Sequence, residues 1–455
     1  MNILVLNGSP KGEYSTTLHT VRYIEAVSRD NSKYVFTYMN VGQEYRKYEN
    51  DFDGVKSLIE ASELVIFAYP VYTFIAPSQL HRFVEMMKEN GVNMRDKYVT
   101  QITTSKHFYD ITAHRYIEDN MMEMGAKVIK GLSADMDDLT CERGQKEARN
   151  FFDYVCHCME NGVHEPSRFS YTAPKHVAVS VPSVDADSRS SGKIINIVAD
   201  LKPEDNQLKA MIDRFMAVSE YECRLINIAE FPFKGGCLSC FACATDGKCV
   251  YTDGFDSFLR ENIQTGDAIV IAFSIKDHSM GVRFKMYDDR QFCNGHRTVT
   301  MGKPFGYIVS GNLSEEENVR TIISARAEVG GNFLAGIAND EFDPDNEIDM
   351  LAKRIKYAVD NRYVQPSNFY GVGGMKIFRD LIYLMQGMMK ADHKFYKSHG
   401  QYDFPQKQKG RIIGMYLVGM LMNSPKLKAK MWNKMNEGMI KPYRKVVDEA
   451  ERKMS

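Results

Sequence analysis

The chain has 455 residues, a formal net charge of −1 at pH 7, 44% hydrophobic residues and 26% charged residues. Its length exceeds one ordinary hydrophobic core and predicts about three structural units, and its composition excludes a disordered or collagen-like chain. The charge is uneven, because residues 366–455 carry 17 Lys and Arg against 7 Asp and Glu. This basic tail is expected to meet an acidic surface of its own body, of a partner or of a membrane.

The ends and the cysteines of the sequence indicate its compartment. The N-terminus shows no basic leader with a cleavage site, and the longest apolar run, residues 412–422, is far below the roughly 20 residues that span a bilayer. Four of the nine cysteines crowd into residues 237–249, which favours metal or redox use over a secreted disulfide scaffold. We therefore expect a cytoplasmic protein without a transmembrane segment, with peripheral membrane contact of the tail left open and no nucleic-acid partner.

The first third of the chain alternates strand and helix patterns. Residues 3–6 form a short apolar run that precedes a Gly-Ser-Pro turn, and a helical pattern follows over about 15–28. Further strands are expected at 34–39, 64–69, 98–103 and 126–132, with helical patterns between them. This alternation predicts a parallel sheet covered on both faces, in a first domain over residues 1–162.

The same order of elements then begins again after a linker over residues 163–191. Strands are expected at 194–198, 223–228, 268–275, 304–310 and 333–337, and a helix at 206–218. We interpret the repeat as an internal duplication of one α/β fold, with the second copy over residues 192–362. Residues 363–455 contain Met-rich helical patterns and no strand, which predicts a basic helical C-terminal region.

The turn after the first strand is rich in glycine and hydroxyl side chains. Such a turn places N–H groups and short donors at a helix N-terminus, where a phosphate is stabilised by the donors and the helix dipole together. Gly8 and Gly12 permit the tight turns. The expected phosphate-binding residues are Ser9, Lys11, Ser15, Thr16 and Thr17.

A second candidate loop follows the third strand. It is aromatic and stiffened by proline, which suits it to packing along a flat ring. The expected ring-contacting residues are Pro70, Val71, Tyr72, Thr73 and Phe74. Either loop alone is a weak signal, whereas both at the ends of the first and third strands favour a flavin site.

These two loops and the following residues 79–84 resemble the flavodoxin-like NAD(P)H-dependent FMN reductases. The resemblance implies two tandem five-stranded parallel sheets in the order 2-1-3-4-5, with FMN as cofactor and NAD(P)H as donor. It also implies a third ring-bordering loop after the fourth strand, here with Thr104, Ser105 and His107. Lys11 stands where the family usually has Arg, which is a mild change. Residues 81–84 differ from the usual family motif, so a contact between the flavin and the helix that contains them is left open.

The second copy carries the motif C-x2-C-x2-C-x5-C, formed by Cys237, Cys240, Cys243 and Cys249. Thiolates at this spacing suit a [4Fe–4S] cluster, and the position resembles the iron-sulfur flavoprotein branch of the same family. A four-thiolate zinc site and a metal-free thiol loop are the alternatives, although zinc usually prefers two separated C-x2-C pairs.

Each of the two copies lacks the motif that the other copy carries. The second copy has Ala199-Asp-Leu-Lys-Pro-Glu-Asp205 where a phosphate loop belongs, and its three acidic groups would repel phosphate, so we expect no FMN there. The first copy has no cysteine in the place of the thiol loop. In iron-sulfur flavoproteins the cluster of one subunit serves the flavin of its neighbour, and the resemblance therefore implies that this tandem is an intrachain version of such a dimer.

The expected function is a flavin-dependent oxidoreductase that uses FMN and NAD(P)H to reduce a small acceptor, with an iron-sulfur cluster as a further carrier. The alternative is a flavodoxin-like electron-transfer protein that serves a separate reductase, and a third hypothesis is a binding protein that keeps FMN structurally. The motifs require no acid or base, since the cofactor performs the transfer, so no catalytic residue is assigned. The acceptor, the choice between NADH and NADPH and the oligomeric state stay open.

Overall fold

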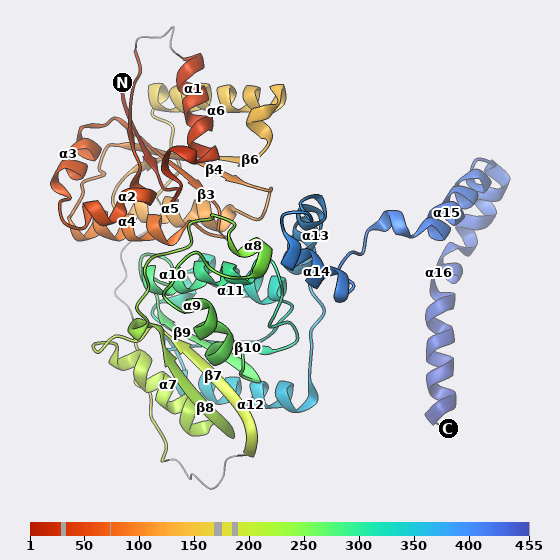
Figure 1. The fold of residues 1–455 in the computed structure, drawn as a ribbon. Coiled ribbons are helices and arrows are strands. Elements are labelled where there is room, and N and C mark those ends of the chain that lie inside the picture. The colour runs from red at the N-terminus through yellow and green to blue at the C-terminus, as the bar shows by residue number, and fades with distance from the viewer. Residues whose placement is uncertain (29–32, 73, 168–174, 184–189, 455) are drawn as a thin grey trace. The chain divides into compact units, whose positions relative to one another are not determined.

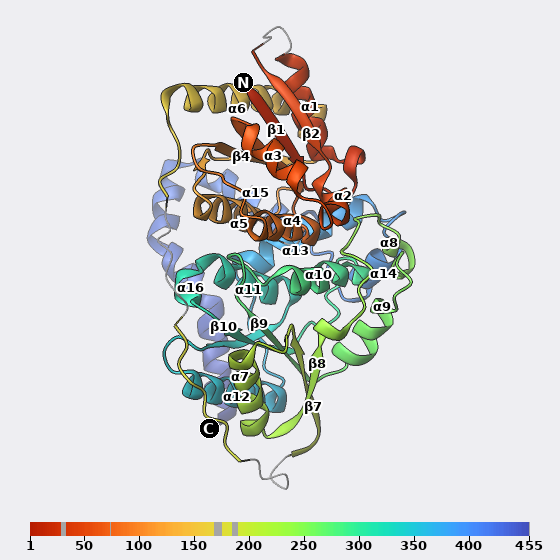
Figure 2. The ribbon, with the colours of Figure 1, turned by 90° about the vertical axis from the view of Figure 1, so that its left-hand side faces the viewer.

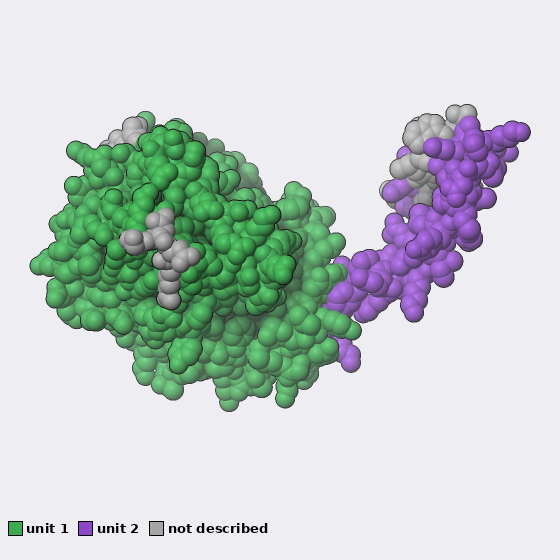
Figure 3. Space-filling model, turned by 90° about the horizontal axis from the view of Figure 1, so that it is seen from above, with its two compact units in different colours: residues 1–395 green, residues 396–455 purple. Residues whose placement is uncertain are grey.

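The computed structural model describes residues 1–28, 33–72, 74–167, 175–183 and 190–454. These residues form two compact units, residues 1–395 and residues 396–455 (Figure 3). The first unit contains two parallel sheets, each with helices on both faces (Figure 1). The α/β class and the two flavodoxin-like sheets expected from the sequence are therefore confirmed.

The first sheet has the strand order β2-β1-β3-β4-β5, and β6 also pairs with β4. Its strands are β1 Asn2–Asn7, β2 Val35–Met39, β3 Leu64–Pro70, β4 Tyr98–Ser105, β5 Lys127–Val128 and β6 Leu132–Asp135. The predicted fifth strand is thus divided into two short strands along β4. The backbone changes course near Gly131, which lies so close to Gln101 that a Cβ atom would stand 2.5 Å from the Gln101 carbonyl oxygen.

Six helices cover the first sheet. They are α1 Thr16–Val27, α2 Val41–Tyr48, α3 Asp53–Ala61, α4 Ser78–Glu89, α5 Ile111–Glu123 and α6 Glu142–Asn161. Alternate residues of a strand point to opposite faces. Ile3 and Val5 of β1 accordingly pack in one core with α1 and α6, while Leu4 and Leu6 pack in another core with α4 and α5.

The second sheet repeats this order as β8-β7-β9-β10-β11. Its strands are β7 Ser190–Ala199, β8 Tyr221–Asn227, β9 Ala268–Ser274, β10 Pro304–Ser310 and β11 Phe333–Asn339. The accompanying helices are α7 Asn206–Val218, α8 Cys243–Asp246, α9 Phe255–Phe258, α10 Val282–Arg290, α11 Glu317–Gly330 and α12 Pro344–Asn361. Helices α7 and α12 pack on one face of this sheet in a core of their own.

The two halves meet through corresponding helices. Helix α4 packs against α10 and α5 packs against α11, and each pair follows the third or the fourth strand of its sheet. Figure 2 shows these helices as two adjacent layers between the sheets, and their apolar residues belong to one continuous core. The junction therefore pairs each helix of the first half with the helix that follows the corresponding strand of the second half.

A buried ionic group lies at this junction. The Lys285 ammonium is completely buried and lies 2.5 Å from Asp289 Oδ1 and 3.1 Å from Asp288 Oδ2. Burial lowers the pKa of Lys285 to about 8, against the Asp289 charge that raises it. Asp289 Oδ2 also accepts a 2.7 Å hydrogen bond from the Ser78 backbone N–H, so the second half satisfies a donor at the N-terminus of α4.

The chain ends in four further helices. They are α13 Phe369–Leu384, α14 Lys390–Ser398, α15 Lys409–Met422 and α16 Pro425–Met454. Helix α13 packs on α11 and belongs with residues 363–395 to the first compact unit. In the described part of the chain, no helix combines the length and apolar character needed to cross a membrane.

Candidate functional site

The turn between β1 and α1 presents its hydroxyl groups at the start of the helix. Asn7 fixes the turn, because its Nδ2 donates to the Gly12 carbonyl oxygen at 2.9 Å and its Oδ1 accepts from the Ser9 N–H at 3.2 Å. Ser15 caps α1 by accepting from the Leu18 N–H at 3.3 Å. Gly12 has φ +53°, a backbone conformation that favours glycine.

A second contact ties this turn to the loop after β4. The hydroxyl groups of Thr17 and Thr104 lie 2.6 Å apart, and both residues are buried. Ser105 Oγ accepts from the Phe108 N–H at 3.2 Å and so shapes the same loop. The carboxyl ends of β1 and β4 thereby meet at one edge of the sheet, as the parallel order requires.

Tyr72, in the loop after β3, faces the second half of the chain. Its ring is 5% exposed and packs edge-to-face on Phe292 with centroids 5.9 Å apart. Burial, assisted by the nearby Cys237, raises the pKa of Tyr72 well above its ordinary value. The Ser239 side chain, in the thiol loop, lies within reach of the Tyr72 hydroxyl and acts against this increase in pKa.

The thiol loop lies between β8 and α9 and is anchored to the first half. The carbonyl oxygen of Cys237 accepts from Gln79 Nε2 at 3.2 Å. Gly236 passes so close to α4 that a Cβ atom would stand 2.0 Å from Ser78 Oγ. Ser239 and Phe241, between the cysteines, have φ values of +51° and +60°, which cost energy for residues with side chains and turn the loop sharply.

Arg290 stabilises the thiol loop through hydrogen bonds and an ion pair. It forms a two-pronged ion pair with Asp253, at 2.8 and 2.7 Å, and donates to the Gly235 carbonyl oxygen at 3.0 Å. Its guanidinium also lies over the Tyr251 ring, 4.4 Å from the centroid. Despite partial burial, the Arg290 hydrogen bonds hold the pKa of Asp253 at about 2. The Asp253 carboxylate therefore stays ionised and keeps its charge-assisted hydrogen bonds with Arg290 beside the loop.

The thiols of the loop differ in their surroundings. Burial raises the pKa of Cys237, and burial followed by the Cys240 charge raises that of Cys243 to about 11. Cys243 Sγ donates to the Phe292 carbonyl oxygen at 3.1 Å, whereas Cys240 is exposed. Among the described residues, no three His, Cys, Asp or Glu side chains gather around one metal-ion position.

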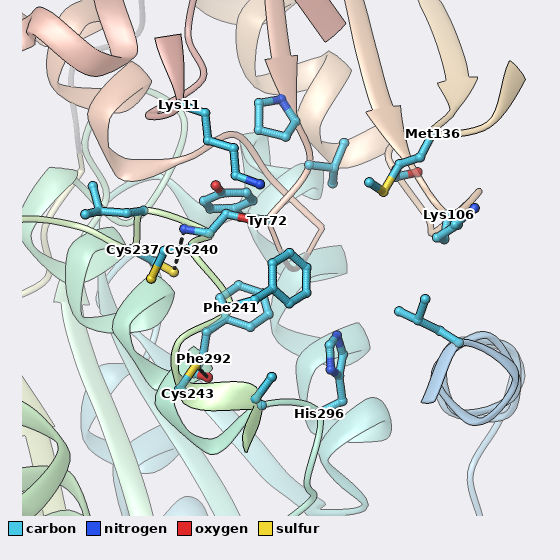
Figure 4. Close-up of a pocket in the computed structure, with 18 of the residues that line it drawn as sticks. Lys11, Tyr72, Lys106, Met136, Cys237, Cys240, Phe241, Cys243, Phe292 and His296 are labelled. Atoms are coloured by element: carbon cyan, nitrogen blue, oxygen red, sulfur yellow. Dashed lines mark hydrogen bonds between the residues drawn. The ribbon is translucent and has the colours of Figure 1, made fainter. Parts of the chain in front are cut away.

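One cavity joins both halves of the predicted site (Figure 4). It has a volume of about 240 Å³ and is lined by residues of the phosphate turn, of the loops after β3 and β4, and of the thiol loop. The predicted residues on its wall are Ser9, Lys11, Ser15, Thr16, Thr17, Pro70, Val71, Tyr72, Thr104, Ser105, Cys237, Cys240, Cys243 and Cys249. Lys11 Nζ lies 5.4 Å from the centroid of the Phe241 ring, a direct contact between the phosphate turn and the thiol loop.

Among the described residues, two predicted site residues do not line this cavity. Phe74 is buried in a cluster with Phe108 and Val329, because its φ of +76° turns it away from the loop. His107 is exposed. Thr73 lies outside the described residues.

The cavity also has walls that the sequence did not indicate. Phe241 and Phe292 add aromatic surface, and His296 faces inward after α10. Helix α13 contributes Ile377, Phe378 and Leu381, and the Phe378 ring stacks on Phe108 with centroids 5.0 Å apart and planes 6° apart. The Gly371-x-Gly373-Gly374 pattern could have indicated that this helix packs closely on another, since small residues permit close helix packing.

The equivalent place in the second half is a separate cavity of different chemistry. Asp200 follows β7 and Lys276 follows β9, and α2 and α4 of the first half close the other side. Glu85 pairs with Lys276 at 2.9 Å, and burial raises the pKa of Asp200. Charged side chains occupy the positions where the first half presents hydroxyl groups.

The geometry defines a class of protein: a parallel α/β domain with a hydroxyl-rich helix N-terminus at the end of its first strand, facing a loop of thiols. Residues 1–134 match the family model described as a flavodoxin-like fold, and this part of the chain is a flavodoxin-like domain.

The chain is also similar to particular proteins. Over 179 residues the chain is 25% identical to an iron-sulfur flavoprotein of Archaeoglobus fulgidus, a match that covers 36% of this chain and 78% of that protein. The apo form of an NADH:FMN oxidoreductase matches at 17% identity and a TM-score of 0.31, over 36% of this chain and 92% of the other. General stress protein 14 of Treponema denticola, solved with FMN, matches at 13% identity and a TM-score of 0.28, over 34% and 98%.

Proposed function

We propose that the chain is an FMN-dependent oxidoreductase whose flavin lies in the shared cavity, next to the thiol loop of the second half. The observation that carries the proposal is that one cavity is lined by the phosphate turn, by the loops after β3 and β4, and by all four loop cysteines. The sequence predicted these segments separately, and Cys237 of the thiol loop follows Ser105 of the first-half loops by 132 positions along the chain.

The chemistry of the wall fits FMN. The N-terminus of α1 and the hydroxyl groups of Ser9, Thr16 and Thr17 suit a phosphate, and Lys11 adds a positive charge. Val71, Phe241 and Phe292 give the apolar and aromatic surface that a flat ring requires.

We propose a [4Fe–4S] cluster as the occupant of the thiol loop in preference to zinc, because the C-x2-C-x2-C spacing suits a cluster and zinc usually prefers two separated C-x2-C pairs. Cys237, Cys240, Cys243 and Cys249 would hold it, and it would supply one-electron transfer when bound. Anaerobic purification followed by iron, zinc and flavin analysis tests this assignment. About four irons per chain support it, whereas zinc or no metal with full flavin content contradicts the cluster and leaves the flavin site standing.

The protein part of the reaction falls to His296. When bound, flavin supplies hydride transfer between NAD(P)H and an acceptor. Buried Asp392 accepts from the His296 backbone N–H at 3.2 Å and so holds this residue beside the cavity, and its other carboxylate oxygen lies 3.8 Å from His296 Nδ1. We infer that His296 donates a proton to the acceptor atom that becomes negatively charged when another atom of the acceptor gains the hydride, and that solvent then returns a proton to His296.

The variant His296→Gln tests this role. We expect kcat for acceptor reduction to fall about a hundredfold, the lower end of general-acid effects, while flavin content and the rate of flavin reduction by NAD(P)H stay unchanged. Stopped-flow absorbance separates the two half-reactions. Equal losses in both would show that His296 only supports the fold of the cavity.

Anaerobic addition of NADH or NADPH tests the function itself. Rapid bleaching of the flavin absorbance band, followed by reoxidation with a small acceptor such as a quinone, supports an enzyme. The exposed thiol of Cys240 favours the alternative of an electron carrier, because it gives electrons a path to a partner surface. Inertness to both nucleotides together with reduction by a partner reductase would establish that carrier, and resistance to every physiological donor would leave only a flavin-binding role.

A further inference from the structure

The second compact unit exposes an unusually apolar helix. Helix α15, Lys409–Met422, has no buried residue. Eight of its large apolar side chains are between 37% and 74% exposed: Ile412, Ile413, Met415, Tyr416, Leu417, Val418, Met420 and Leu421. A contiguous apolar surface of this kind marks an interaction site rather than a solvated face.

These side chains surround the helix. Successive residues are rotated by about 100° around a helix with 3.6 residues per turn, so Ile412, Tyr416 and Met420 share one side while Ile413, Leu417 and Leu421 lie on another. Val418 and Met415 project toward the remaining sides. A groove on a protein covers one side of a helix and would leave several of these side chains in water, whereas insertion at the boundary of the acyl chains buries most of them.

Basic residues flank the apolar segment on both sides. Lys407, Lys409 and Arg411 lie at or before the start of α15, and Lys426, Lys428 and Lys430 begin α16; all six are exposed. Residues 396–455 carry 13 Lys and Arg against 5 Asp and Glu, a surplus of 8. Lysines beside an apolar insertion are the arrangement that anionic headgroups attract.

We propose that residues 396–455 bind the surface of an anionic phospholipid bilayer, with α15 lying in the boundary between headgroups and acyl chains. A helix of 14 residues is about 21 Å long, too short for a hydrocarbon core of about 30 Å. The segment therefore inserts without crossing, and its flanking lysines stay at the headgroups. This inference does not depend on the proposed redox function.

Flotation of the full chain with vesicles tests the proposal. Vesicles of phosphatidylcholine alone are compared with vesicles of phosphatidylcholine and phosphatidylglycerol in equal parts, at low and at high salt. We expect roughly tenfold or more protein on the anionic vesicles, with a loss at high salt, because each lysine near the surface contributes on the order of 1 kcal/mol. The single tryptophan, Trp432, supplies a second signal through its emission.

Two variants separate the apolar and the charged contributions. Ile413→Asp with Leu417→Asp should abolish vesicle binding, and Lys426→Glu with Lys428→Glu should remove the preference for anionic lipid. The matched control is Leu58→Asp with Tyr154→Asp, which alters exposed apolar residues of α3 and α6 and should bind as the unchanged chain does. Circular dichroism checks that helix content is kept.

Three results would overturn the proposal. Equal recovery on both kinds of vesicle would remove the role of charge, and binding that survives the α15 variant would remove the role of the helix. An absence of vesicle binding combined with self-association that the α15 variant abolishes would show that a second copy of the chain, and not lipid, covers this surface. Each outcome is read from flotation and from the sedimentation velocity of the same samples.

Discussion

At the scale of single residues, Lys11 is the cation nearest to the proposed phosphate position. Lys11 belongs to the turn before α1 and also lies over the Phe241 ring. The sequence indicated this lysine because it sits in a glycine and hydroxyl turn after a buried strand, a pattern that local geometry dictates. It could not indicate Phe241 as its neighbour, since that contact depends on how the two halves pack.

The variant Lys11→Met should weaken FMN binding about tenfold or more, since a charge-assisted phosphate contact contributes roughly 1.5 to 3 kcal/mol. The measurement is quenching of FMN fluorescence on titration with the apoprotein. The matched control Lys146→Met removes an exposed lysine of α6 outside the cavity and should leave the Kd unchanged. Equal affinity in both variants would place the phosphate elsewhere.

Phe74 and His296 show why residue type alone does not place a side chain in this cavity. Phe74 was expected along the ring, yet it packs under Phe108 and α13. Its aromatic type fits a buried cluster as well as a ring contact, and residue type alone does not separate the two. His296 carries no local motif, and only the fold brings it to the cavity beside Asp392.

At the scale of elements, helix α13 closes one wall of the cavity. The sequence predicted helices after residue 366 as an appendage, and a helical pattern does not reveal which surface it covers. Gly374 of α13 lies against Val329 and Phe108, where an added Cβ atom would meet Val329 Cγ2 at 2.8 Å and Phe108 Cε2 at 3.2 Å. Gly373, one residue earlier, meets nothing within 4 Å.

These neighbouring glycines form a matched pair. Gly374→Leu should push α13 away, lower the free energy of unfolding by about 1 to 3 kcal/mol as overpacking does, and raise the Kd for FMN. Gly373→Leu should be neutral or slightly stabilising, because glycine disfavours helix interiors. Urea unfolding and FMN titration check both variants, and similar behaviour of the two would mean that α13 does not form this wall.

At the scale of the whole chain, two parallel sheets were predictable because strands and helices alternate along the sequence, and the family resemblance implied their strand order. The packing of α4 on α10 and of α5 on α11 was not predictable from the sequence, since it depends on surfaces formed only after folding. His278 marks this junction. Its Nδ1 lies 2.8 Å from Glu316 and its Nε2 lies 3.4 Å from Glu123 of the first half.

This ion pair predicts a pH dependence of stability. Burial opposes the charged imidazole, but hydrogen bonds with Glu123 and Glu316 raise the pKa of His278 to about 9, above the ordinary 6.5. The stabilisation is therefore complete below pH 6.5 and is lost as the pH rises through 9. Between pH 6 and pH 8 the loss should be about 1 to 2 kcal/mol.

The free energy of unfolding in urea at pH 6 and pH 8 measures this loss, and the control is His278→Gln, whose stability should change less over the same range. The interval ends at pH 8 because Lys285, with its pKa lowered to about 8, contributes a rising stability above that value. Since both proteins retain Lys285, the difference between them isolates His278. Parallel pH profiles would contradict the junction as described.

The central claim is that flavin lies between the phosphate turn of the first half and the thiol loop of the second. A crystal structure of the full chain with FMN measures this directly. The account predicts the phosphate at the N-terminus of α1, near Ser9 and Thr17, and the ring in the cavity beside Tyr72 and the Cys237–Cys249 loop. FMN bound with its ring outside this cavity, or in the charged cavity near Asp200, would contradict it.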